Sequence, residues 1–215
     1  MTKLTNERLH EHLKETRQRL RKRDLFGAAG DSLSVRVPGR NAFILAKAAT
    51  QAIQTIATAD ADSESERLHA AIYRTRPDIG AVLIGTSEWS TALLYLGGTL
   101  PALFDEQARH LGDGAPSVRA GDWSALEEGI RPGGNALTFG SQRVVLGATP
   151  NRVVLNADLF EKCAKAFVIA SSATATVRSL PRWARRIWVR RLRADQARAA
   201  RAYQDGRIPE GMDAY

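Results

Sequence analysis

The chain has 215 residues, of which 44% are hydrophobic, and this is enough apolar material for one domain over 1–215 with helical extensions at its ends. No segment approaches the roughly 18 apolar residues that a membrane-crossing helix needs, and no signal-peptide core is visible, so we expect a cytoplasmic protein without a membrane partner. The single cysteine, Cys163, excludes an internal disulfide and a cysteine metal cluster.

The amino-terminal part of the chain predicts one helix followed by a hairpin. A helix over about residues 4–24 is expected because leucines recur there on one side, between charged residues. These leucines are Leu9, Leu13 and Leu20. Alternating apolar and polar residues predict a strand over 33–37, and a second strand over 42–47 follows the turn at Pro38. The segment 49–61 is ambiguous.

The middle of the chain predicts a helix, a buried strand and a second helix. Ser63 and Glu66 form the S-x-x-E pattern of a capping box, which predicts a helix that continues to about Arg76. The continuous apolar run 81–84 is typical of a strand that is covered on both faces. Thr86 or Ser87 can then cap a short helix.

The carboxyl-terminal part predicts a short helix over 123–130 and two strands around Gly140. A long helix is expected after Thr149, because apolar residues recur there at spacings of three and four. A final arginine-rich helix is expected over about residues 181–205. Short strands and helices without a regular alternation predict an α+β fold with helices on the faces of a sheet.

Arginines are concentrated at the two ends of the chain, and the formal net charge is +8. Solvated faces of amphipathic helices are the simplest interpretation. Binding of nucleic acid or another anionic surface is a second one, and ion pairs across an oligomer interface are a third. No RNA-binding signature, zinc finger or aromatic platform accompanies the arginines, so nucleic acid is not the partner that we expect.

Three segments carry a family resemblance: GDSLSVRVPG from Gly30, IYRTRPDIGAV from Ile72 and GATPNRVVLNADLFEKCAKA from Gly147. In this order they resemble the class II aldolase/adducin family, whose enzymes cleave or rearrange sugar phosphates. The resemblance implies a three-layer α/β/α fold with a central, mostly antiparallel sheet. It also implies a homotetramer with sites at the subunit boundaries.

The family's divalent metal is held by three histidines and stabilises an enediolate oxygen. The resemblance maps these histidines onto Ile84, Thr86 and Ser141, and an isoleucine cannot coordinate a metal, while a hydroxyl is a poor zinc ligand. The family's glutamate base maps onto Ser65, four residues before His69. We therefore expect no zinc and no other metal cofactor, and we interpret His69 as a structural residue.

The same mapping defines a cleft that could still bind a small anionic or sugar-like ligand. Its expected lining residues are Asp31, Ser32, Ser65, Ile84, Thr86 and Ser141. Glu66 could act as a base after a shift of one residue, but capping of the helix is the simpler role. Lys47 could attract an anion, and a solvated lysine at a strand end is the simpler interpretation.

The segment FDEQARHLG, from Phe104, gathers Asp105, Glu106 and His110 within a few residues. Such a group can serve acid–base catalysis in a cleft, or it can form interface salt bridges or a solvated loop. Two functional hypotheses follow. The first is an aldolase-like protein without zinc chemistry that binds a small molecule or serves assembly. The second is a metal-independent lyase or isomerase that uses these three side chains.

Overall fold

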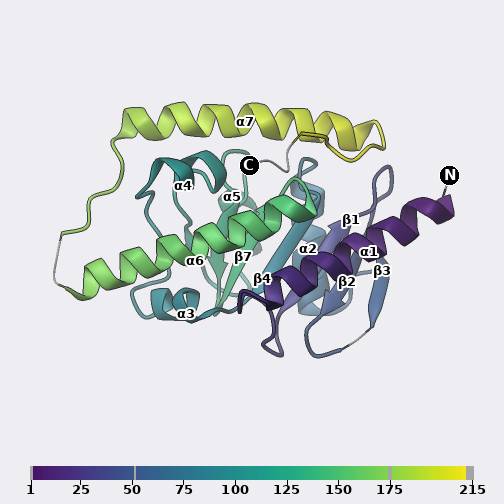
Figure 1. Ribbon diagram of the computed structural model, residues 1–215, viewed down its shortest axis with the longest axis horizontal. Coiled ribbons are helices and arrows are strands. Elements are labelled where there is room, and N and C mark those ends of the chain that lie inside the picture. The colour runs from purple at the N-terminus through teal and green to yellow at the C-terminus, as the bar shows by residue number, and fades with distance from the viewer. Residues whose placement is uncertain (1, 51, 174–175, 212–215) are drawn as a thin grey trace.

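The computed structural model describes residues 2–50, 52–173 and 176–211 (Figure 1). In chain order its elements are α1 (Thr2–Arg21), β1 (Ser32–Arg36), β2 (Ala42–Lys47), β3 (Ile53–Ala57), α2 (Glu64–Thr75), β4 (Ala81–Gly85), α3 (Glu88–Leu94), α4 (Asp105–His110), β5 (Ser117–Val118), α5 (Trp123–Gly129), β6 (Ala136–Phe139), β7 (Gln142–Gly147), α6 (Pro150–Ser172) and α7 (Arg182–Gln204).

The strands of the described residues form one sheet in the order β3-β2-β1-β4-β7-β6-β5. Neighbouring strands are antiparallel, except for the short parallel pair of β5 and β6. The strand β4 is central, and its Ile84 lies opposite Ser32 of β1 and Val144 of β7. The predicted mixed fold with a mostly antiparallel sheet is therefore confirmed.

The two faces of the sheet are covered by different helices. On one face Val82 and Ile84 of β4 pack with Leu126 of α5 and with apolar residues of α2. On the other face Leu83 packs in a cluster that includes Phe160 of α6 and the three predicted leucines of α1. Figure 1 shows α1 and α6 lying across this second face. Both sides of β4 are buried, which explains why its sequence is apolar without alternation.

The helix caps predicted from short sequence patterns are present in the structure. Ser63 caps α2 by accepting a hydrogen bond from the backbone N–H of Glu66 at 3.3 Å, and Glu66 accepts one from the N–H of Ser63 at 3.3 Å. The predicted capping box is thus confirmed. Thr149 caps α6 in the same way, through the backbone N–H of Arg152. The ambiguous segment 49–61 contains β3.

The arginine-rich helix α7 is docked on the body through a small buried side. Leu192 and Ala199 are buried, α7 contacts α4, and the hydroxyl of Tyr203 donates a hydrogen bond to the carbonyl of Ala148 at 2.8 Å. Most arginines of α7 lie outside this contact. Within the described ranges, every helix is too short or too polar to cross a membrane.

Candidate functional site

A buried chain of hydrogen bonds connects β1 to α2 beside the carboxyl end of β4. We call Ser32, Ser34, Ser65, His69 and Tyr73 the serine–histidine cluster. The two ring nitrogens of His69 contact the hydroxyls of Ser32 at 2.9 Å and Ser34 at 2.7 Å. Ser65 donates to the hydroxyl of Ser32 at 3.0 Å, and the hydroxyls of Ser34 and Tyr73 lie 2.8 Å apart. These polar groups therefore satisfy one another inside the protein.

Burial keeps His69 and Tyr73 uncharged. Desolvation lowers the pKa of His69 to about 3, and the positive charge of Lys47 acts in the same direction, against the weaker effect of Glu66. Desolvation also raises the pKa of Tyr73. The ring of Phe43 stacks near His69, with 5.9 Å between the ring centroids. A neutral imidazole in this setting is a structural connector between strand and helix.

The edge of the cluster is closed by an ion pair. The Lys47 ammonium donates to a carboxylate oxygen of Glu66 at 2.8 Å. This bond, together with the contacts to Ser63, lowers the pKa of Glu66 to about 2. Glu66 therefore caps α2 as expected, whereas Lys47 is held by a carboxylate and is not simply solvated.

Asp31 is buried, and its carboxylate accepts three backbone hydrogen bonds. One oxygen accepts from Gly27 at 2.7 Å and Ala28 at 3.0 Å, and the other accepts from Thr86 at 2.9 Å. A Cβ atom at Gly85 would collide with this carboxylate, so glycine permits the close approach of β4. Asp31 thus ties the loop before β1 to the end of β4.

The three positions that the resemblance assigns to zinc ligands differ in burial. Ile84 is only 1% exposed and belongs to the apolar core, Thr86 is half-buried after β4, and Ser141 is exposed in the turn between β6 and β7. Throughout residues 2–50, 52–173 and 176–211 there is no group of three or more His, Cys, Asp or Glu side chains that could hold a metal ion.

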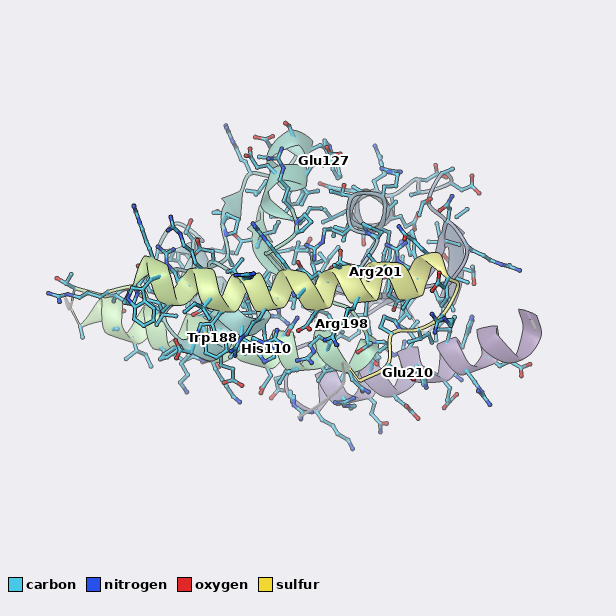
Figure 2. All side chains as sticks on the ribbon, turned by 90° about the horizontal axis from the view of Figure 1, so that it is seen from above. His110, Glu127, Trp188, Arg198, Arg201 and Glu210 are labelled. Atoms are coloured by element: carbon cyan, nitrogen blue, oxygen red, sulfur yellow. The ribbon has the colours of Figure 1, made fainter. Side chains whose placement is uncertain are left out.

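Asp105, Glu106 and His110 all lie on α4, but Asp105 and Glu106 do not line the cavity that His110 lines. The two acidic residues are exposed in the first turn, whereas His110 is buried and lines a cavity of about 320 Å³. Ile79, which precedes β4, lines the same cavity. The cavity therefore lies at the opposite end of β4 from Thr86. In Figure 2 His110 is seen below α7.

His110 is also held as a neutral ring. Its Nδ1 atom lies 3.1 Å from Nη1 of Arg152, and because a guanidinium only donates, the ring nitrogen accepts. Burial, together with the positive charges of Arg152 and Arg109, lowers the pKa of His110 to about 4, against the weaker effect of Asp195. At neutral pH the imidazole therefore supports the position of the Arg152 guanidinium.

Two arginines with structural roles were not identified from the sequence. Arg76 is 0% exposed and makes a double contact with the Asp78 carboxylate, at 2.7 and 2.6 Å. It also donates to the carbonyls of Ile130 and Gly134 at 2.7 and 2.6 Å. Arg36 donates to carbonyls at the end of α2. The R-P-D triplet in the sequence pointed to Arg76 and its neighbour Asp78. Nothing in the sequence indicated the distant partners of Arg76, the carbonyls of Ile130 and Gly134.

A second fully buried arginine, Arg143, lies on the α1 and α6 face of the sheet. Arg143 is 1% exposed and donates to the carbonyl of Leu25 at 2.6 Å. Its Nε and Nη1 atoms have no hydrogen-bond partner within the described part of the chain. Desolvation lowers the pKa of Arg143, and the charges of Glu161 and Asp31 oppose this shift. Its position in the otherwise apolar strand β7 was the visible signal in the sequence.

Comparison with known proteins identifies one family. The sequence profile of the Class II Aldolase and Adducin N-terminal domain matches residues 43–168. No curated protein matches the chain.

Solved structures with the same fold are numerous. YgbL from Klebsiella pneumoniae is 21% identical, with a TM-score of 0.70 over 86% of this chain and 99% of that chain. An L-fuculose 1-phosphate aldolase is 17% identical, with a TM-score of 0.71 over 88% of this chain and 96% of that chain. The L-fuculose 1-phosphate aldolase from Glaciozyma antarctica is 14% identical, with a TM-score of 0.68 over 92% of this chain and 88% of that chain. At these identities the similarity concerns the fold.

Proposed function

Because the chain belongs to the class II aldolase and adducin family, we propose that it uses the family's fold to bind a small molecule or to assemble, without zinc-dependent aldol chemistry. The observation that carries this proposal is the chemistry at the positions that the resemblance assigns to the zinc ligands. Ile84 packs in the apolar core at one of them.

The side chains at these positions do not fit a zinc ion. Zinc sites in proteins use imidazole, thiolate or carboxylate ligands at about 2.0–2.3 Å. Ile84 offers only hydrocarbon, and the hydroxyls of Thr86 and Ser141 are weak donors for zinc. The absence of an alternative group of ligands within the described residues supports this proposal.

The position that the resemblance assigns to the family's base holds a serine, whose hydroxyl does not remove a proton from carbon at neutral pH. The Ser65 hydroxyl donates to Ser32, and Ser32 in turn contacts His69. The neighbouring carboxylate of Glu66 is committed to Lys47 and to the cap of α2. These contacts support a stabilising role for the cluster, in place of general base catalysis.

Self-association is the assembly role that we propose, as the resemblance implies a homotetramer. Large apolar side chains at the surface support it: Tyr95 is 88% exposed and Trp183 is 69% exposed.

The second hypothesis, a metal-independent lyase or isomerase, gains no specific support. Its three proposed catalytic groups are divided between an exposed helical turn, with Asp105 and Glu106, and the buried cavity of His110. General acid–base catalysis requires groups within hydrogen-bond reach of one substrate.

The proposed function predicts that the purified protein does not cleave L-fuculose 1-phosphate. The rate of product release should equal the uncatalysed rate both with and without added zinc, because Ile84, Thr86 and Ser141 cannot hold the metal that would polarise the substrate. The L-fuculose 1-phosphate aldolase that shares this fold serves as the positive control. Zinc-dependent cleavage above background, abolished by Thr86→Ala, would overturn the proposal.

A further inference from the structure

A groove of about 930 Å³ lies between α7 and the segment that contains β5 and α5. This volume is near the upper end of the range of pockets for small ligands, roughly 300 to 1,000 Å³. Val118, Ala125 and Val189 supply apolar lining. In Figure 2 Glu127 of α5 lies above α7, whereas His110 lies below it. The groove, which we call the α5–α7 groove, shares no lining residue with the cavity of His110.

Arginines supply most of the charge that lines the α5–α7 groove. The lining contains two acidic residues, and each already has an arginine partner: Asp113 accepts a hydrogen bond from Arg185, and Glu128 lies 3.7 Å from Arg131, which does not line the groove. Five lining arginines against two carboxylates leave a surplus of three positive charges, and a concave surface with such a surplus attracts anions. The five arginines are Arg182, Arg185, Arg186, Arg190 and Arg193.

Four of these arginines form a row along one side of α7. Arg182, Arg186 and Arg190 follow one another at intervals of four residues, and Arg193 comes three residues later. Within the described part of the chain, the side chains of Arg182, Arg186 and Arg190 make no hydrogen bond or ion pair. Like charges four residues apart on a helix repel each other. An anion in the groove would therefore relieve a repulsion that the protein alone leaves in place.

The other two arginines are held against the wall of the groove. Arg185 is fixed by its ion pair with Asp113. Arg193 donates from Nε to the carbonyl of Pro132 at 3.2 Å. A Cβ atom at Gly133 would lie only 2.8 Å from this Nε atom, so the glycine leaves room for the guanidinium. The groove thus combines two held guanidinium groups with three that are available to a ligand.

The length of the row indicates the kind of anion that fits it. From Arg182 to Arg193 the row extends over roughly 16 Å along the helix axis. A guanidinium group binds phosphate oxygens in pairs, so one phosphate group engages only a small part of such a row. A chain of linked phosphates carries several anionic groups in succession and can engage several arginines at once.

We propose that the α5–α7 groove binds a polyphosphate, a molecule with three or more linked phosphate groups, with Arg186 and Arg190 as principal contacts. The proposal deepens the small-molecule role proposed above, but it does not depend on the absence of zinc. A zinc-binding wild-type protein that also bound a polyphosphate in this groove would overturn the proposed function alone. A protein that bound neither zinc nor a polyphosphate would overturn this inference alone.

The test is isothermal titration calorimetry of the full chain at constant ionic strength, without divalent cations that would shield the phosphates. The probes are inorganic triphosphate, ATP, orthophosphate and a short single-stranded oligothymidylate. We expect saturable binding of triphosphate or ATP, at least about tenfold tighter than that of orthophosphate, because more charge-assisted contacts form. The tighter of the two shows whether the apolar lining also holds an organic group.

The variant Arg186→Gln/Arg190→Gln should weaken this binding by about tenfold or more. Both side chains are exposed, and an unchanged circular dichroism spectrum would verify that the variant is folded. The matched control is Arg40→Gln/Arg201→Gln, which removes the same charge from two exposed positions that do not line the groove. Its dissociation constants should equal those of the wild type.

Three results would overturn the proposal. The first is that neither triphosphate nor ATP binds saturably. The second is that the control variant weakens binding as much as Arg186→Gln/Arg190→Gln does. The third is that the oligothymidylate is the only probe that binds, which would make the groove a site for nucleic acid.

Discussion

Replacement of Arg76 by methionine should lower the free energy of unfolding by about 3 to 5 kcal/mol. Arg76 is fully buried, and its removal leaves the buried carboxylate of Asp78 without its partner. It also leaves the carbonyls of Ile130 and Gly134 without their donor. Urea denaturation followed by circular dichroism would measure the loss.

Two further variants show whether the loss comes from the buried charge. Arg74→Met removes an arginine that donates to the Thr58 carbonyl from an exposed position, and it should change the stability by no more than about 0.5 kcal/mol. The double variant Arg76→Met/Asp78→Leu should recover part of the loss, since no buried carboxylate remains. Equal stabilities of Arg76→Met and Arg74→Met would contradict the role of Arg76.

The second large effect concerns acid. The pKa of His69 falls from 6.5 to about 3 on folding, so between these values the unfolded chain binds a proton that the folded protein excludes. The contribution of the neutral His69 ring to the free energy of unfolding is therefore complete above about pH 6.5, and it is lost as the pH falls from there toward 3. The loss amounts to about 1.4 kcal/mol per pH unit, or about 2 kcal/mol between pH 6.5 and 5. His110, with a pKa of about 4, acts in the same direction.

Denaturation at a series of pH values from 7 to 5 separates the two histidines. His69→Gln should lower the slope of unfolding free energy against pH by about one proton, whatever its effect on stability at pH 7. His110→Gln should lower it by a similar amount, and the double variant by the sum of the two. An unchanged slope in His69→Gln would mean that this ring is protonated in the folded protein.

Features of the fold that depend on neighbouring residues could be predicted from the sequence. The capping box joins Ser63 to Glu66, which is only three positions further along the chain. The leucines on the buried side of α1 follow from helical periodicity alone. The mostly antiparallel character of the sheet came from the family resemblance, and the order of its strands was not predicted. The segment with β3 stayed ambiguous, because short edge strands carry little periodic signal.

The candidate sites were harder to predict, because their partners are far apart in the chain. Arg76 meets Ile130 and Gly134 only after the sheet has formed, and Arg152 meets His110 between two helices that are not consecutive. Proximity in the sequence suggested a common cleft for Asp105 and His110, but the turn of α4 directs them to different surroundings. Helical spacing alone does not decide which face is buried.

The central claim, that isoleucine and hydroxyl side chains have replaced the family's metal ligands, is tested most directly by zinc binding to the wild-type protein. Elemental analysis after equilibrium dialysis against zinc should find no more metal than in a matched buffer, since Ile84, Thr86 and Ser141 do not form a tetrahedral site. About one zinc ion per chain, lost in the Thr86→Ala or Ser141→Ala variant, would contradict the claim.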